Sequence, residues 1–540
     1  MNKKTFMYGA MILTAAGVIS KILGACFRIP LGNMIGDEGM AYYEAAYPIY
    51  VLLLTVATTG IPVAISRMIA ERISVDDKGG ATRVFRVSLT IMIILGVILF
   101  SILFFGADLI SSSFKGLDKA YLGMRALAPS LIILPIMAAF RGYFQGFQDM
   151  KPTAVSQMIE QLFRVIVGLS LAYFLISNGT EFAAAGGTFG ATAGAAAGLV
   201  IMLIVYAKRK GEITYRERRE EQKLINENRS ESTLSIVGTL FSIAVPITIG
   251  AAIMPIMKYI DLWIVTDRLT QALELPEETV RAMYGQLSGF ASPIVNLPKF
   301  ITQAIAISMV PTVVRAFKTK DKEFMQYNIS LGMRFAVMIG LPCTVGIMVL
   351  SEPILKLLYP NQLQAAESAA PSMFILALGI VFLAIIETLT GVLQGVGKQM
   401  IPVINLVIGI VVKIILTYML TSIESINIMG AAIGTVTAYA IATALNYRSV
   451  IIYTGTKFDL QLTFVKPLIS VAAMGIIAYV AFALLHSIVG NNLATVISVL
   501  AGALVYLIML FVTKSISPDE LKMFPKGDKV YNLFNKVIKK

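Results

Sequence analysis

The sequence predicts an all-α polytopic membrane protein with about fourteen transmembrane helices, and three observations support this fold class. The chain of 540 residues is 57% hydrophobic and only 14% charged. Apolar runs of about 20 residues recur along it, and a helix of that length spans roughly 30 Å of hydrocarbon. The net charge of +13 comes from Lys and Arg residues in the segments that flank these runs, which is typical of membrane topology and argues against a nucleic-acid partner.

Each predicted span is an apolar run of helical length that ends at polar or turn-forming residues. In chain order, the spans cover residues 6–31, 45–68, 84–107, 120–141, 153–177, 183–206, 235–264, 284–314, 327–351, 371–394, 401–421, 428–447, 464–486 and 493–513. The first resembles a signal peptide, but its apolar run passes residue 25 and ends without a small-residue cleavage site, so we expect a retained helix.

Two spans carry marked features. In the sixth span a glycine recurs every four residues, which favours close packing of two helices; these are Gly186, Gly190, Gly194 and Gly198. In the seventh span Pro246 and Pro255 remove backbone hydrogen bonds and predict kinks.

The distribution of basic residues predicts that both termini are cytoplasmic. Of 45 Lys and Arg residues, five fall in the external segments and eight in the spans, which leaves 32 in the cytoplasmic segments. Such an excess of positive charge is expected on the cytoplasmic side of a plasma membrane. The tail at 514–540 has an apolar and a basic face, which predicts an interfacial helix on the anionic inner leaflet.

An internal repeat predicts two six-helix lobes. Ala-Pro-Ser occurs at 128–130 and 370–372, Gly-x-x-Gln-Gly at 142–146 and 391–395, and a cation at Arg164 and Lys413. Six spans separate the copies, so the lobes share one orientation and form a pseudo-two-fold repeat with a site at their interface. We therefore expect an N-lobe at 1–206, a charged cytoplasmic loop at 207–233, a C-lobe at 234–453, two further helices at 454–513, and the tail.

Charged residues inside the spans predict an anionic substrate. A charge at the bilayer centre costs roughly 2.5–3.5 kcal/mol, so such residues usually face a polar interior. The basic ones are Lys21, Arg28, Arg125, Arg164, Lys258, Lys299, Arg334 and Lys413. The acidic ones are Glu160, Asp261 and Glu387, so five positive charges are in excess.

Several segments resemble the stage V sporulation protein B and MurJ-type branch of the MOP flippase superfamily. They are "AGVISKILGACFRIPLGNMIGDEGMAYYEAAYPIY" at 16–50, "TTGIPVAISRMIAE" at 58–71 and "YGQLSGFASPIVNLPKFIT" at 284–302. The resemblance implies alternating-access flipping of an undecaprenyl-diphosphate-linked cell-wall precursor, lipid II, to the outer leaflet. It matches the family's first-helix cations to Lys21 and Arg28 and an early acidic position of helix two to Glu44. The charged motif that opens helix eight in proteobacterial members is absent, which leaves Lys299 as the nearby charge.

Each candidate residue also has a structural interpretation. Lys21 and Arg28 lie two turns apart on one helix face, where they suit a diphosphate; Arg28 alone could instead reach toward the interface. Lys299, Arg164, Lys413, Arg125 and Arg334 are further candidates for substrate binding. We expect Lys258 with Asp261, and Glu160 with Arg164, to form structural pairs. Coupling-ion binding at Asp261, Glu160 or the isolated Glu387 is the alternative.

The sequence contains no sign of an enzyme active site. There is one histidine, His486, and no phosphate-binding loop, so neither a metal centre nor ATP hydrolysis is expected and transport would use an H⁺ or Na⁺ gradient or the membrane potential. We expect a monomer in the bacterial plasma membrane, in contact with membrane lipids, a polyprenyl-diphosphate-linked glycan and cell-wall synthesis enzymes. Three alternatives remain: a flippase for another lipid-linked polysaccharide, a MATE-like antiporter, and a non-transporting cell-wall scaffold.

Overall fold

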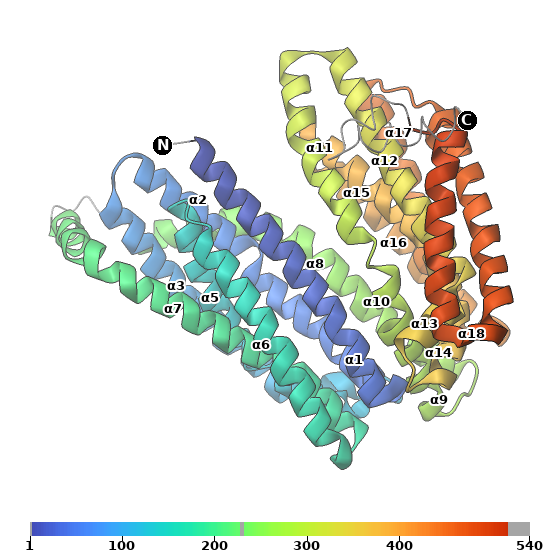
Figure 1. Cartoon of the computed structure of the whole chain (residues 1–540). Coiled ribbons are helices and arrows are strands. Elements are labelled where there is room, and N and C mark those ends of the chain that lie inside the picture. Colours follow the sequence, from blue (N-terminus) through green and yellow to red (C-terminus); the bar gives the residue numbers. More distant parts are fainter. Residues whose placement is uncertain (1–2, 227–231, 517–540) are drawn as a thin grey trace. The chain divides into compact units, whose positions relative to one another are not determined.

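The computed structural model in Figure 1 describes residues 3–226 and 232–516. Side chains are described throughout these ranges except at residues 3–15, 18, 21, 25, 209–226, 300 and 307. The described residues form helices and turns, with no β-strand among them. Contacts group the chain into two compact units. The predicted amphipathic tail helix lies outside the described residues.

The first unit comprises Met1–Pro293 with the short segments Asn361–Ala365 and Thr417–Gly430. Its helices are α1 (Lys3–Thr58), α2 (Gly60–Ser74), α3 (Lys78–Ser111), α4 (Tyr121–Leu127), α5 (Ser130–Gly146), α6 (Lys151–Leu175), α7 (Thr180–Asn226), α8 (Thr233–Gln271), α9 (Glu277–Gly285) and the π-helix η3 (Gln286–Ala291), with 3-10 turns η1 (Asp118–Ala120) and η2 (Ile176–Asn178). The helix α7 therefore continues into the segment predicted as a charged loop at 207–233. Pro246 and Pro255 lie within α8, which continues through both.

The helices α6 and α7 lie side by side and pack through the predicted glycine row (Figure 1). A Cβ atom at Gly190 would lie 2.5 Å from the carbonyl oxygen of Arg164, and one at Gly194 would lie 2.3 Å from that of Glu160. Neither distance is possible for a real side chain, so the two backbones touch directly. The predicted close packing is confirmed.

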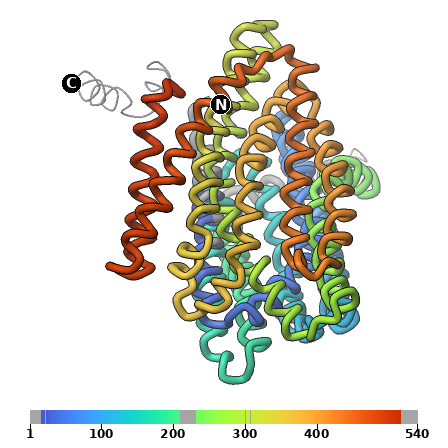
Figure 2. Tube along the Cα trace, turned by 90° about the vertical axis from the view of Figure 1, so that its right-hand side faces the viewer, coloured from blue at the N-terminus to red at the C-terminus, as the bar shows by residue number. Residues whose placement is uncertain are grey.

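The second unit comprises Ile294–Pro360, Ala366–Leu416 and Ala431–Lys540. Its helices are α11 (Lys299–Thr319), α12 (Lys322–Val349), α13 (Ser351–Leu358), α14 (Leu363–Ala377), α15 (Gly379–Gly395), α16 (Met400–Thr421), α17 (Met429–Thr454), the π-helix η4 (Gln461–Val465) and α18 (Lys466–Val512); the short α10 (Ser292–Val295) leads into it. Gly490, at φ 76° and ψ 171°, breaks α18 into two arms that run side by side, as Figure 2 shows. Gly502 of the second arm faces Ala478 of the first.

Eleven helical segments among the described residues are long and apolar enough to cross a membrane. Two of them, Ile22–Ser74 and Gln461–Val512, each overlap two predicted spans, because the chain reverses at Gly36 and at Gly490 while the residues on either side stay helical. The predicted span 284–314 is not among the eleven, since α9, η3, α10 and α11 divide it into short pieces. The count of fourteen stays a prediction.

The two copies of the internal repeat share their local packing. In α5, a Cβ atom at Gly142 would lie 2.9 Å from the carbonyl oxygen of Pro62 in α2. In α15, a Cβ atom at Gly391 would lie 2.6 Å from the carbonyl oxygen of Ala306 in α11. Both helices then end alike: two residues beyond each helix the backbone is left-handed, at Gln148 with φ 60° and at its counterpart Gly397 with φ 77°. The repeat therefore extends from sequence to backbone conformation.

The division of the chain by contacts differs from the predicted lobes at one place. Residues 234–293, which we expected in the second lobe, have most of their contacts with the first unit. The lobe boundaries at 206 and 234 follow the repeat, and they stay a prediction.

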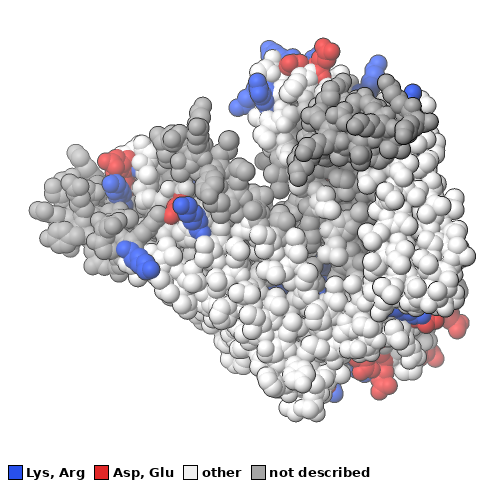
Figure 3. All heavy atoms as spheres, viewed as in Figure 1, with Lys and Arg blue, Asp and Glu red and all other residues white. Residues whose placement is uncertain are grey.

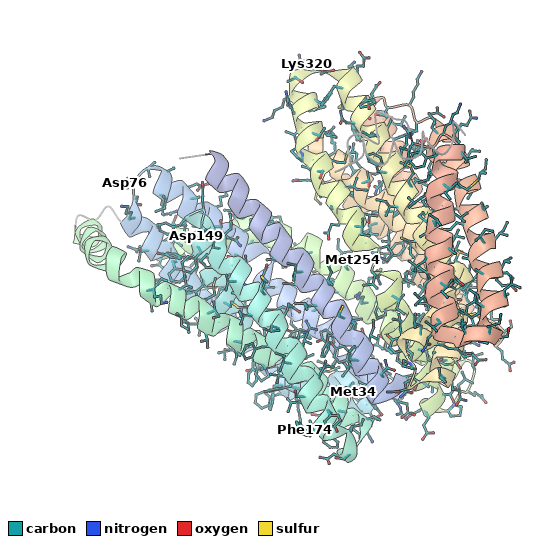
Figure 4. All side chains as sticks on the ribbon, in the orientation of Figure 1. Met34, Asp76, Asp149, Phe174, Met254 and Lys320 are labelled. Atoms are coloured by element: carbon teal, nitrogen blue, oxygen red, sulfur yellow. The ribbon has the colours of Figure 1, made fainter. Side chains whose placement is uncertain are left out.

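Within the first unit, the turns alternate between two ends of the helices. Asp76 and Asp149 lie toward one end and Met34 and Phe174 toward the other, as Figure 4 shows. This is the order expected when successive loops lie on opposite faces of a membrane. On the face shown in Figure 3, Lys, Arg, Asp and Glu side chains gather near helix ends, and a wide uncharged surface lies between them.

Candidate functional site

The break at Gly36 folds α1 into a hairpin and so creates the first part of the candidate site. Arg28 and Glu44 are 16 positions apart, and in an unbroken helix they would lie about 24 Å from each other. Instead, Nη1 of Arg28 lies 2.8 Å from Oε1 of Glu44. The backbone at Gly36 has φ 69° and ψ −173°, a region open essentially only to glycine. This glycine allows the two charged side chains to meet.

The Arg28–Glu44 ion pair remains accessible. The Arg28 side chain is 27% exposed and that of Glu44 is 13% exposed. A guanidinium has five N–H donors, and this ion pair engages one terminal nitrogen. The arginine can therefore reach a second acceptor without moving far.

Arg164 on α6 is the second guanidinium of this region, and it contacts tyrosines. Its Nη2 atom donates hydrogen bonds to the hydroxyl of Tyr47 at 2.6 Å and to that of Tyr43 at 3.3 Å. The guanidinium also lies over the Tyr47 ring, 5.5 Å from its centroid. Among the described residues, its buried Nε atom has no hydrogen-bond partner. Arg164 contacts Tyr43, the residue before Glu44, so it lies near the Arg28–Glu44 ion pair.

The two tyrosines are functional candidates that the sequence interpretation missed. Tyr43 donates a hydrogen bond to Tyr47 at 3.0 Å, and Tyr50, one turn further, accepts one from Ser130 at 2.9 Å. Their spacing of four and then three residues puts all three tyrosines on one face of the helix. That spacing is the signal in the sequence that could have identified them.

The expected ion pair of Glu160 with Arg164 is wrong, because Glu160 pairs with Arg141 instead. Oε2 of Glu160 accepts a hydrogen bond from Nη2 of Arg141 at 2.8 Å, and Arg141 also donates to Ser156 at 3.0 Å. Arg141 was placed at the end of a predicted span, but α5 continues to Gly146 and carries it alongside α6. Glu160 is thus half of a structural ion pair.

Asp261 and Tyr284 lie at the margin of the same region. The phenol of Tyr284 is within electrostatic range of Glu44, Asp261 and Arg28. Asp261 and Lys258 both have interactions with other residues. Their pairing with each other and a coupling-ion role for Asp261 stay predictions.

The second unit holds an ion pair that the sequence analysis did not foresee. Nζ of Lys299 on α11 lies 3.0 Å from Oε1 of Glu387 on α15, and the two side chains are 36% and 22% exposed. We expected an isolated Glu387, because no cation lies near it in the sequence, and this expectation is wrong. The close packing of α15 on α11 at Gly391, four residues further, brings the two charges together.

Each of the remaining candidate cations has an interaction partner in the folded structure. Nη2 of Arg125 lies 2.6 Å from Oδ2 of Asp108, and both side chains are well exposed. Nη2 of Arg334 donates to the carbonyl oxygen of Ser515 at 2.6 Å. Lys413 is only 3% exposed and also has a partner. A substrate role for these three residues stays a prediction.

The excess of positive charge inside the helices is smaller than the sequence count. Glu44 and Asp108 lie in helices that extend past the predicted spans, and each neutralises a cation that the count left unpaired. The side chain of Lys21 lies outside the described residues. Within the described part of the chain, no group of three or more His, Cys, Asp or Glu side chains could hold a metal ion.

Family comparisons agree with this architecture. The family described as "Polysaccharide biosynthesis protein" matches residues 6–317, and the family MatE matches residues 287–419. "Stage V sporulation protein B" of Bacillus subtilis (strain 168) is 28% identical over 97% of this chain and 98% of the relative. "Lipid II flippase MurJ" of the same organism is 28% identical over 82% of this chain and 81% of the relative.

Solved structures show the same fold. One described as "Lipid II flippase MurJ, inward closed conformation" has a TM-score of 0.66 at 17% identity and covers 93% of this chain and 98% of its own. An inward-facing multidrug resistance MATE family transporter of the MOP superfamily has a TM-score of 0.67 at 16% identity, over 81% and 94%. With more than half of its length matched by one family, this multi-pass membrane protein belongs to the polysaccharide biosynthesis protein family.

Proposed function

We propose that this chain is a flippase that moves the peptidoglycan precursor lipid II from the inner to the outer leaflet of a bacterial plasma membrane. Two curated relatives, one of them called a lipid II flippase, match at 28% identity over most of the chain. The family description supports the coarser proposal of a role in polysaccharide biosynthesis, and the name of the second relative supports a lipid-linked cargo. The proposal places about fourteen spans in the membrane, with both termini in the cytoplasm.

The observation that carries the proposal is the pair of guanidinium groups in the first unit. Arg28 pairs with Glu44, while Arg164 donates hydrogen bonds to the neighbouring Tyr43 and to Tyr47, so the carboxylate of Glu44 pairs with only one of the two guanidinium groups. Two guanidinium groups, of which only one is paired with a carboxylate, can offer further N–H donors to an anionic ligand. A diphosphate suits such a site, because each of its oxygens can accept charge-assisted hydrogen bonds from a guanidinium.

In the proposed mechanism, the diphosphate of the precursor binds to Arg28 and Arg164 while the lipid tail stays in the bilayer. Tyr43 and Tyr47 hold the Arg164 guanidinium in place, so that little side-chain freedom is lost on binding. Alternating access then exposes the head group to the outer face. An anion leaving a negative interior gains about 2.3 kcal/mol per elementary charge and 100 mV, so the membrane potential is a sufficient drive; a gradient of H⁺ or Na⁺ is the other proposed source.

A MATE-like antiporter is the second candidate function, and the match of the MatE family to residues 287–419 favours it. Antiporters of cationic drugs need a carboxylate that is free to receive the drug. The carboxylates of Glu44 and Glu387 are each paired with a cation in this structure. This pairing favours the flippase.

Leaflet exchange in proteoliposomes tests the proposal. We expect vesicles that contain the protein to move fluorescently labelled lipid II between leaflets faster than empty vesicles, and an inside-negative potential to increase the rate. A precursor with the same undecaprenyl diphosphate but a different glycan distinguishes lipid II from another polysaccharide unit. Transport of a cationic dye without any exchange of lipid II would favour the antiporter instead.

A further inference from the structure

Each unit holds a partly exposed ion pair in which at least one partner lies on a helix that can span a membrane. Arg28 pairs with Glu44 in the first unit, at 2.8 Å, with side chains 27% and 13% exposed. Lys299 pairs with Glu387 in the second, at 3.0 Å, with side chains 36% and 22% exposed. In both pairs the cation is the more exposed partner, so it is the partner that an incoming ligand reaches first.

These two ion pairs differ from the ion pair of Arg141 with Glu160, in which additional hydrogen bonds fix the arginine side chain. Arg141 donates to Ser156 as well as to Glu160, so two of its nitrogens are engaged. Arg28 engages one terminal nitrogen with its carboxylate, and an ammonium such as that of Lys299 makes single-point contacts. The accessible pairs are therefore easier to exchange for another acceptor.

In a transporter that binds an anion through fixed cations, the return step of the empty protein has an electrostatic cost. After the anion leaves, the empty protein must change conformation with those cations inside the membrane. An uncompensated charge at the bilayer centre costs roughly 2.5–3.5 kcal/mol, and removal of its partner from a buried ion pair is strongly destabilising for the same reason.

We propose that Glu44 and Glu387 are resident counter-anions for the empty protein. An anionic group of the substrate that binds to either cation displaces the carboxylate paired with that cation, and the carboxylate returns when the anionic group leaves. The proposal rests on the proposed flippase function and deepens it. It assigns these two glutamates to the return step and to release of the head group, not to attraction of the substrate.

The charge-neutral variants Glu44→Gln and Glu387→Gln test this assignment, because glutamine keeps the size of the side chain and removes only the charge. Without a competing carboxylate, the cation should bind the diphosphate more tightly, so we expect the Kd for undecaprenyl diphosphate to fall by about tenfold. The maximal rate of lipid II exchange should fall by a similar factor, because release and return become slow.

Glu181→Gln is the matched control. Glu181 forms an ion pair with Lys119 at 2.7 Å and its side chain is 16% exposed, close to the value for Glu44. It lies at the start of α7, and its ion-pair partner Lys119 is not one of the candidate site residues. This variant should change neither the Kd nor the exchange rate. Glu44→Asp, which keeps the charge, should retain more exchange than Glu44→Gln and so guards against a purely structural effect.

Binding is measured with undecaprenyl diphosphate on purified protein, and exchange with labelled lipid II in proteoliposomes. Tighter binding together with slower exchange in both glutamine variants supports the proposal. Weaker binding in the variants, or unchanged binding and exchange, overturns the proposal. If the wild-type protein still exchanges lipid II in that case, the flippase function stands without the counter-anion assignment. Wild-type protein that neither binds undecaprenyl diphosphate nor exchanges lipid II refutes the flippase function, and the counter-anion assignment with it.

Discussion

Substitution of Gly36 by alanine tests how the chain assembles its candidate site. At φ 69° and ψ −173°, this glycine occupies a region where another residue costs about 1–3 kcal/mol of backbone strain. The added Cβ atom would lie 3.3 Å from Oε1 of Gln362, the end of a flexible side chain that can move. Backbone strain, and not a steric clash, therefore sets the expected loss of stability at about 1–3 kcal/mol. If the chain relieves it by altering the hairpin, Arg28 and Glu44 move apart.

Gly490→Ala is the control that separates an effect on stability from an effect on the geometry of the candidate site. Gly490 has nearly the same conformation, φ 76° and ψ 171°, and a Cβ atom there would meet nothing within 4 Å. Both variants should lower the midpoint of thermal unfolding in detergent by similar amounts. Only Gly36→Ala should also reduce lipid II exchange in proteoliposomes, by about tenfold or more, as expected when one charge-assisted contact is lost. Equal exchange rates in the two variants would refute the reasoning that the Gly36 hairpin positions the site.

Three further changes have defined outcomes. Gly194→Ala forces α7 away from α6 and should lower the free energy of unfolding by about 1–3 kcal/mol, measured by denaturation in detergent. Tyr47→Phe removes the 2.6 Å hydrogen bond from Arg164 and should weaken binding of undecaprenyl diphosphate by about threefold to tenfold; an unchanged Kd contradicts the positioning role. The hydrogen bond from Lys356 to Glu352 raises the pKa of the lysine, so the pair stabilises the fold below the ordinary lysine pKa and loses this effect as the pH rises through the raised value. Lys356→Met should therefore cost less than about 1 kcal/mol at neutral pH and nothing at strongly alkaline pH, in unfolding experiments at both.

Features that depend on neighbouring residues in the sequence were predictable. Long apolar runs mark most of the helices, because only the length and hydropathy of one segment decide whether it can span a membrane. The glycine row at 186–198 predicted the contact of α7 with α6, because four-residue spacing puts small residues on one helix face. The repeated Gly-x-x-Gln-Gly element likewise corresponds to matching helix contacts in α5 and α15.

The partners of the charged residues were not predictable, because tertiary packing selects them. Lys299 and Glu387 are 88 positions apart, and only the packing of α15 on α11 brings them together. Arg28 reaches Glu44 because the backbone at Gly36 adopts a positive φ, and nothing in the sequence distinguishes that glycine from the other 41. Hydropathy also ends a predicted span at its charged residues, which is why Glu44 fell just outside a predicted span and Arg141 at the very end of one.

The central claim is that Arg28 and Arg164 bind the diphosphate of a lipid-linked precursor. The most direct measurement compares lipid II exchange in proteoliposomes between wild-type protein and the variants Arg28→Gln and Arg164→Gln, at equal amounts of folded protein. The account predicts exchange by the wild type and a loss of at least about tenfold in each variant. Exchange at the wild-type rate in both variants would contradict it.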